Sequence, residues 1–154
     1  MTRWSEEDYQ AFISGKTPTE KKPSKYHNEK PTAIDPRTGE AIKFDSNKEM
    51  KFFFELLARE KAGEVFKIKR QVEFEIQPAF TDATGKKQRP IKYVADFVYY
   101  ERINPRRIGE KLVSDDIKVH IVDVKGSPKT LTEVYKLKKK LLAYKGIIIE
   151  EVYQ

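Results

Sequence analysis

The stretch IKYVADFVYYE at residues 91–101, together with IKVHIVDV at residues 117–124, decides the fold of this chain. Both stretches are rich in β-branched and aromatic residues, which favour strands over helices. A third stretch, VFKIKRQVEFEIQ at residues 65–77, alternates apolar with charged residues, as a half-buried strand does. Turn-forming residues separate the three stretches, so we expect three consecutive strands that pair antiparallel.

Two amphipathic segments frame these strands. In KEMKFFFELLAREKAGE at residues 48–64, the apolar residues follow helical spacing as far as Gly63. After the third strand, Thr130 and Glu133 form a capping-box pattern that predicts a helix over residues 131–145. The sequence therefore predicts one helix before the three strands and one after them.

The closing IIIEEV at residues 147–152 is typical of a buried strand, and we expect it to run parallel to the 117–124 strand after a right-handed crossover. The predicted order is helix, three strands, helix, strand. This order predicts an α/β fold with a mixed four-stranded sheet flanked by helices.

The N-terminal part of the chain differs in composition from this core. Residues 4–13, WSEEDYQAFI, favour a short helix, whereas residues 16–31 contain three prolines and five lysines and favour a mobile linker. A PRTG turn within residues 32–44 predicts a weak hairpin. We therefore expect an N-terminal helix and basic arm over residues 1–40 and a single domain over residues 41–154.

Composition narrows the chemistry. The 154 residues include 31 Lys and Arg against 24 Asp and Glu, a formal charge of +7 that favours a polyanionic partner such as DNA. The absence of cysteine excludes disulfides and thiolate chemistry, and two histidines leave little for an imidazole metal site. A bound metal would be held by carboxylates, which favours Mg²⁺ or Mn²⁺. No apolar run approaches a membrane span, so we expect no membrane partner and a cytoplasmic location.

Asp96 is an acid in the middle of the most apolar predicted strand. Burial of a carboxylate is costly unless it is paired or binds a metal. By alternation Asp96 shares a face with Val94 and Val98, so it does not simply lie on the solvent side. A buried structural carboxylate is the alternative interpretation.

Asp123 and Lys125 end the next predicted strand and, being two residues apart, point to one face of the sheet. If the two strands are neighbours, Asp96 and Asp123 converge on one cation. Phosphodiester hydrolysis needs a divalent ion to polarise the phosphate and activate a water, and Lys125 would orient that water. An ordinary ion pair at a strand end is the alternative for Asp123 and Lys125.

At this point the chain resembles the PD-(D/E)XK nuclease superfamily, whose signature is an acid on one strand followed by (D/E)-x-K on the next. Asp96 matches the first acid, and Asp123-Val124-Lys125 matches the second part, although Ala95 replaces the usual preceding proline. More closely, the chain resembles a family of small phage-encoded proteins labelled as a domain of unknown function. This resemblance covers roughly residues 40–152 and rests on these segments: FDSNKEMKFFFELL, RQVEFEIQPAF, YVADFVYY, VDVKG and VYKLKKKLL.

The resemblance implies further site residues. Glu49 on the first helix matches a glutamate that often completes the metal site, although Ser46 and Glu49 also form a capping box. Gln71 matches an active-site neighbour, although a polar residue on a half-exposed strand is usually solvated. The implied catalytic residues are Glu49, Gln71, Asp96, Asp123 and Lys125, and the implied metal ligands are Glu49, Asp96, Asp123 and Val124.

The second predicted helix is strongly basic, with six lysines and one acid over residues 129–145. Helical geometry puts Lys138 within the apolar face, where it could snorkel or reach a phosphate. We expect Lys136, Lys138 and Lys139 to contact DNA; a solvated helix face is the alternative. The KK and RR pairs at 86–87 and 106–107 mark loops that could follow a DNA backbone.

These patterns predict a Mg²⁺-dependent DNA endonuclease, selective for branched or junction DNA in phage recombination or replication and acting in the cytoplasm of the bacterial host. Sequence-specific or exonucleolytic cutting is an alternative with the same chemistry. A non-catalytic DNA-binding or assembly protein with structural carboxylates is the alternative from another class. Junction resolution would favour a homodimer, although no dimer surface is legible in the sequence.

Overall fold

A computed structural model describes residues 30–154 of the chain, so the helix expected at residues 4–13 and most of the linker expected at residues 16–31 lie outside the described part. The two-helix, four-strand order predicted for the core is confirmed. The elements are β1 Thr32–Ile34, β2 Ala41–Lys43, α2 Asn47–Lys61, β3 Val65–Gln77, β4 Phe80–Thr81, β5 Lys87–Gln88, β6 Ile91–Ile103, β7 Arg106–Ile108, β8 Lys111–Val113, β9 Asp116–Lys125, the 3₁₀ turn η1 Pro128–Thr130, α3 Glu133–Tyr144 and β10 Glu150–Tyr153.

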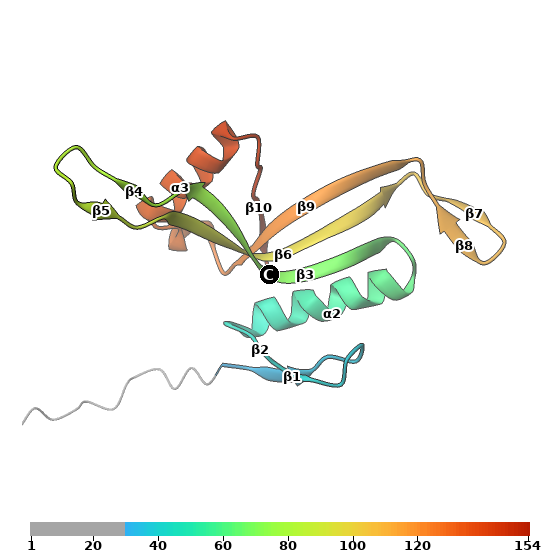
Figure 1. The fold of residues 1–154 in the computed structure, drawn as a ribbon. Coiled ribbons are helices and arrows are strands. Elements are labelled where there is room, and N and C mark those ends of the chain that lie inside the picture. Colours follow the sequence, from blue (N-terminus) through green and yellow to red (C-terminus); the bar gives the residue numbers. More distant parts are fainter. Residues whose placement is uncertain (1–29) are drawn as a thin grey trace, which may run out of the picture.

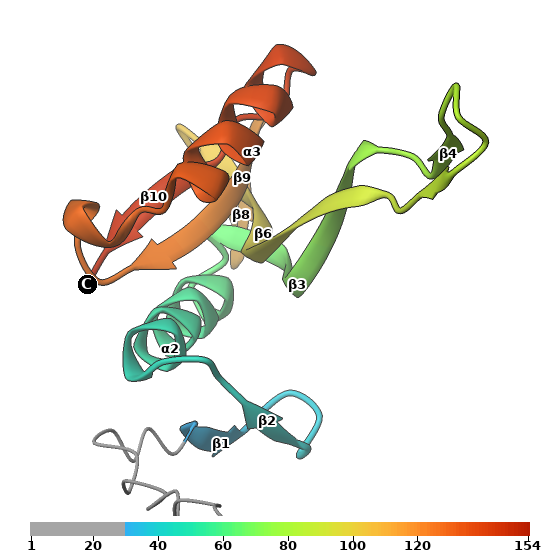
Figure 2. The same cartoon turned by 90° about the vertical axis from the view of Figure 1, so that its left-hand side faces the viewer.

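The central sheet has the strand order β10-β9-β6-β3. β3, β6 and β9 pair antiparallel, and β10 pairs parallel with β9, which confirms the predicted mixed sheet. The helix α2 packs beside one part of the sheet and α3 beside another, on the opposite side of the molecule (Figures 1 and 2). The α/β fold class expected from the sequence is therefore confirmed.

The helix α2 forms where the sequence predicts it. The Ser46 hydroxyl caps the N-terminus by accepting a hydrogen bond from the Glu49 amide, and Gly63 follows the C-terminus with a φ of 81°, which glycine adopts without strain. Phe52, Phe53 and Leu56 are buried against the sheet. The β1–β2 hairpin packs on the other side of this helix (Figure 2).

The start of α3 differs from the prediction. Thr132, not Thr130, is the N-cap, and its hydroxyl accepts a hydrogen bond of 3.1 Å from the Tyr135 amide. Thr130 instead belongs to η1, which begins with Pro128. The proline fixes its own φ and supports a tight turn after Ser127, so the chain completes this turn before the helix can begin.

The two connections between the long strands carry short hairpins that the sequence did not predict. β4 pairs with β5 between β3 and β6, and β7 pairs with β8 between β6 and β9. Both hairpins project from the body of the protein at opposite ends (Figure 1). The KK and RR pairs therefore lie on or beside projecting hairpins.

Two apolar clusters hold the fold together. The first joins α2, the β1–β2 hairpin and one half of the sheet, around Phe53 and Phe97. The second joins α3 and the residues that lead into β10 to the sheet, around Ala95 and Leu142. In the described residues, no helix is both long and apolar enough to cross a membrane.

Candidate active site

The sheet opens between β6 and β9 at the acids predicted from the sequence. The pairing of these strands ends at Phe97↔Val122, and the next backbone amide of β9 that faces β6, that of Val124, donates a hydrogen bond of 2.8 Å to Asp96 Oδ2. Beyond this point β6 continues with β3, and β9 continues with β10. A side chain thus replaces a backbone partner where the two halves of the sheet separate.

The strand β3 is bent at the same level. Its register passes from Arg70↔Phe97 to Val72↔Ala95, so Gln71 lies opposite Asp96. Gln71 has a φ of 49°, in the left-handed region that costs a non-glycine residue about 1–2 kcal/mol. Arg70 contacts the cluster beside α2, whereas Val72 packs in the cluster beside α3. At Gln71 the strand therefore changes which of its faces lies toward each helix. The alternation of side chains between the two faces of the sheet is interrupted at this residue.

Asp96 and Asp123 are brought together, as predicted from the sequence. Asp123 is buried, with 4% of its surface exposed. Burial, together with the hydrogen-bonding and charge interaction with Asp123, raises the pKa of Asp96 to about 7. Two carboxylates held this close in a poorly solvated site repel each other unless a proton or a cation lies between them. The pair therefore has the electrostatics of a cation site.

Lys125 completes this group, as the D-x-K spacing predicts. Its ammonium Nζ lies 2.5 Å from Asp123 Oδ2 and 4.5 Å from the centroid of the Tyr135 ring. Although this ion pair is short, Oδ2 accepts no hydrogen bond among the described residues and is buried. We call Asp96, Asp123 and Lys125 the carboxylate site.

Two tyrosines beside the carboxylate site were missed by the sequence reasoning. Tyr93 is buried and its hydroxyl has no hydrogen-bond partner among the described residues; burial and then the charge of Asp123 raise its pKa. The ring of Tyr135, from α3, packs against that of Tyr93 at 6.1 Å between centroids. The alternation of Tyr93 with Ala95 could have placed Tyr93 in the core, but no sequence signal brings Tyr135 to Lys125.

Glu49 is buried near this group but is engaged with other partners. Its Oε2 accepts a hydrogen bond of 2.9 Å from the amide of Asp45, the residue before the N-cap Ser46. Its Oε1 accepts hydrogen bonds from Arg70 at 3.3 Å and from the Gln71 side chain at 3.4 Å. The charge of Glu49 contributes the smallest of the effects that raise the pKa of Asp96. Glu49 thus links α2 to the bend in β3.

The oxygen donors of the carboxylate site fit a metal ion only in part. Among residues 30–154, no group of three or more His, Cys, Asp or Glu side chains is close enough to bind one ion. Two carboxylates do converge, and the buried Oδ2 of Asp123 has the ammonium of Lys125, at 2.5 Å, as its partner among the described residues. Mg²⁺ often binds through one or two carboxylates and keeps several waters, so this pair, with the Val124 carbonyl as a further oxygen donor, suits it.

The three lysines predicted to contact DNA all have partners within the chain. Lys136 pairs with Glu133 at 2.7 Å, and Lys139 pairs with Glu151 at 2.6 Å. Lys138 is half-buried, as helical geometry predicted, and donates to the Lys92 carbonyl at 2.8 Å. Lys138 and Lys139 therefore fasten α3 to the sheet, and DNA contact by these lysines stays a prediction.

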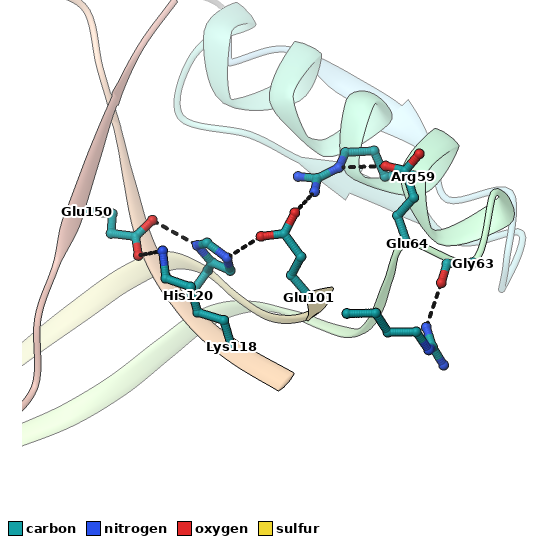
Figure 3. Close-up of polar contacts among 8 residues, drawn as sticks. Arg59, Gly63, Glu64, Glu101, Lys118, His120 and Glu150 are labelled. Atoms are coloured by element: carbon teal, nitrogen blue, oxygen red, sulfur yellow. Dashed lines mark hydrogen bonds and ion pairs between the residues drawn. The ribbon is translucent and has the colours of Figure 1, made fainter. Parts of the chain in front are cut away.

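A second polar group lies further along β6 and β9 (Figure 3). The ring of His120 lies between two carboxylates, with Nε2 2.7 Å from Glu101 and Nδ1 2.8 Å from Glu150. Both contacts are hydrogen bonds when both ring nitrogens carry a proton. Arg59 pairs with Glu101, and Lys118 pairs with Glu150. We call these five residues the histidine cluster.

The histidine cluster is electrostatically balanced. Burial alone would raise the pKa of Glu101, but the hydrogen bond and charge of His120 and the charge of Arg59 outweigh it and leave this pKa lowered. The pKa of Glu150 is lowered in the same way, against burial, by His120 and Lys118. The ring of His120 also stacks on Tyr99 at 4.8 Å. The cluster ties α2, β6, β9 and β10 together.

Comparison with known proteins gives one match. A family model described as "Protein of unknown function (DUF1064)" matches residues 23–153, nearly the whole chain. No curated protein and no solved structure matches. The predicted resemblance to a family of unknown function is confirmed, and the wider resemblance to the PD-(D/E)XK superfamily stays a prediction.

Proposed function

Since the chain belongs to the DUF1064 family, whose description names no activity, we propose from its carboxylate site that it is a metal-dependent DNA endonuclease, selective for branched or junction DNA. One observation carries the proposal: two acids from neighbouring strands share a buried position beside a lysine, and the pKa of Asp96 is raised to about 7. Strongly perturbed acids that lie together in this way mark functional sites.

In the proposed mechanism, Asp96 and Asp123 hold a divalent cation, with the Val124 carbonyl as a further donor. These oxygens would hold Mg²⁺ or Mn²⁺, and the chemistry supplied by such an ion would be polarisation of the phosphate and activation of a water. The ammonium of Lys125 orients the attacking water and offsets the negative charge that develops on the phosphate oxygens. Its position between Asp123 and the Tyr135 ring limits its movement.

Glu49 and Gln71 have positioning roles in this proposal. Glu49 accepts hydrogen bonds from Arg70 and Gln71 and so holds the bend of β3 beside Asp96. The strained backbone of Gln71 is a further argument for function, because such strain persists where the surroundings enforce it and it clusters at active sites.

The shape of the fold supports the proposed selectivity for branched DNA. The β4–β5 and β7–β8 hairpins project at opposite ends and carry basic pairs at 86–87 and 106–107, so they could follow separate DNA arms (Figure 1). The compact core offers few elements that could read a sequence in a groove.

A non-catalytic DNA-binding or assembly protein is the second candidate. One observation favours it: within residues 30–154, no group of three acids or histidines is close enough to hold one metal ion. In that case the carboxylate site is structural, and the net positive charge alone would attract DNA.

The test is a cleavage assay with the full chain. Labelled single-stranded, duplex, flap and four-way-junction DNA, and a circular duplex, are incubated with Mg²⁺, Mn²⁺ or a chelator. We expect divalent-dependent cutting, fastest on branched DNA, and a loss on the order of a thousandfold in Asp96→Asn and Asp123→Asn. Asp115→Asn, at an exposed acid paired with Arg106, is the matched control and keeps full activity. Binding without cutting on every substrate would favour the second candidate.

A further inference from the structure

The helix α3 turns lysines toward the sheet and large apolar residues toward solvent. Its sheet-facing row is Tyr135, Lys138, Lys139 and Leu142, of which the first three are half-buried and the last is fully buried. Its outer row is Val134, Leu137, Leu141 and Tyr144, with 64%, 57%, 38% and 91% of their surface exposed. A helix that packs on a sheet ordinarily buries its apolar face. This reversed polarity indicates that the outer face of α3 has a partner.

The spacing of the outer row specifies the kind of partner. The four residues are separated by three, four and three positions, and Ile148, which is 61% exposed, follows shortly after the end of the helix. This alternation of three and four is the pattern of a narrow seam that packs against another helix. In Figure 2, where α3 faces the viewer, no described element lies in front of the helix.

The area of the seam matches what a dimer needs. At about 200 Å² for a fully exposed large apolar side chain, the five exposed fractions amount to roughly 600 Å² per copy. Two copies would bring together about 1,200 Å², at the lower end of the range for stable interfaces. A contiguous patch of roughly 600 Å² is at the upper end of what ordinary monomers expose, and patches of that size often mark interaction sites.

The charges on α3 allow two copies to approach. Lys136 and Lys139 are paired with acids, and Lys138 donates to a backbone carbonyl. Lys145, at the C-cap, donates to the Ile76 carbonyl. Lys140 is the one lysine of the helix with no ion pair or side-chain hydrogen bond within residues 30–154. The ion pairs thus cancel two of these charges, and the carbonyl contacts hold the ammonium groups of Lys138 and Lys145 against the sheet, away from the outer row.

We propose that the outer face of α3 is a homodimer interface, in which α3 packs antiparallel against α3 of a second copy about a two-fold axis. In antiparallel pairing, the side chains that meet across the interface are complementary in size. This pairing sets Leu137 opposite Leu141 of the second copy, and the small Val134 opposite the large Tyr144. Lys140 then lies close to its own counterpart beside the axis. The pairing does not depend on the proposed nuclease activity, but it would give a nuclease two sites related by symmetry.

The first test measures the mass of the full chain in solution by light scattering, without metal or DNA, from about 1 to 100 μM. We expect twice the chain mass for the wild type and a monomer for Leu137→Glu/Leu141→Glu. Ile108→Glu/Ile117→Glu is the matched control, because these residues are 58% and 54% exposed far from α3. A wild-type monomer throughout, or a dimer that survives the α3 substitutions, would overturn the proposal. Circular dichroism checks that both variants are folded.

A second variant tests the geometry without disturbing the seam. The chain has no cysteine, so Lys140→Cys introduces a unique thiol beside the proposed axis. Under mild oxidation it should form a disulfide-linked dimer at least tenfold faster than Lys111→Cys, at an exposed lysine of β8. Equal rates would contradict antiparallel pairing. Because neither readout uses cleavage, failure of the dimer is distinguishable from failure of the nuclease.

Discussion

The carboxylate site and the histidine cluster lie on the same two strands, a few residues apart. They differ in how the charges of their buried acids are compensated. In the histidine cluster the acids have cationic partners, and the pKa values of Glu101 and Glu150 are lowered. In the carboxylate site two acids face each other, and the pKa of Asp96 is raised to about 7. A balanced network stabilises a fold, whereas an unbalanced one lowers its stability until a ligand binds.

The backbone around the two groups shows the same contrast. Beside the histidine cluster the β6–β9 ladder is continuous, and His120 lies in register with Tyr99. At the carboxylate site the ladder has ended, and Gln71 holds a left-handed conformation opposite Asp96. The β6–β9 ladder is therefore continuous beside the histidine cluster and ends beside the carboxylate site, whereas β3 has a left-handed residue at both levels, Lys67 and Gln71. Four substitutions or conditions test this contrast.

The largest expected effect is on stability, in the histidine cluster. His120→Ala leaves Glu101 and Glu150 facing each other without the ring between them, and breaking a buried charged network costs about 3 kcal/mol or more. Urea denaturation at pH 7 measures this loss. The folded variant should still cut DNA, because the substitution does not touch the carboxylate site. A loss of less than about 1 kcal/mol would mean that the cluster is not a structural network.

The carboxylate site should respond in the opposite direction. Asp96→Asn removes one of two like charges and keeps an oxygen that accepts the Val124 amide, so it should stabilise the metal-free protein at pH 8 by about 2 kcal/mol. Asp115→Asn is the matched control and should give no gain, because the exposed Asp115 pairs with Arg106. Thermal denaturation in a chelator measures both variants. Destabilisation by Asp96→Asn would show that the carboxylate is structural.

The stability of the metal-free wild type should therefore depend on pH in two ways: it should fall on the acid side of a maximum (the acid limb) and on the alkaline side (the alkaline limb). Because the pKa of Asp96 is raised to about 7, the folded state binds more protons than the unfolded state between about pH 4 and pH 7, so stability falls across this range and levels off above it. Because the pKa values of Glu101 and Glu150 are lowered, their contribution is present above about pH 4.5 and is lost as the pH falls below it. Urea titrations from pH 3 to 9 should show a maximum near pH 5, with a change of roughly 1–2 kcal/mol on the alkaline side.

Variants assign the two limbs to their sources. Asp96→Asn should flatten the alkaline limb alone, and saturating Mg²⁺ should do the same in the wild type. His120→Ala should flatten the acid limb alone. An alkaline limb that persists in Asp96→Asn would assign it to another group and remove the electrostatic argument for a cation at this site.

Much of the carboxylate site could be predicted from the sequence, because its strands and the spacing of its residues follow short-range sequence patterns. Alternation predicts the strands, and the two-residue spacing of Asp123 and Lys125 puts both on one face. Asp96 stands out as an acid in an apolar strand. The convergence of these residues follows once β6 and β9 are neighbours, as two consecutive strands often are.

The remainder depends on tertiary contacts that have no local signature. Nothing in the sequence pairs His120 with Glu101 and Glu150, which are 19 and 30 residues away. The reversed polarity of α3 was also hidden, because lysines and leucines alternate through the helix and the sheet decides which row is inner. The bend at Gln71 was missed because a left-handed residue within a strand pattern has no distinctive composition.

The smallest expected effect comes from two substitutions of Gln71, which separate the contribution of its backbone conformation to stability from that of its side chain. Gln71→Gly removes the cost of a left-handed φ, so it should raise stability by about 1 kcal/mol, less the loss of the weak 3.4 Å hydrogen bond to Glu49. Gln71→Ala loses the same side chain but keeps the strain, and so should be slightly destabilised. If the amide of Gln71 also serves cleavage, both variants lose activity equally while their stabilities move apart. If the bend alone matters, Gln71→Ala keeps its activity. A destabilised Gln71→Gly would mean that the left-handed conformation is not strained, and the strain argument for this site would fail with it.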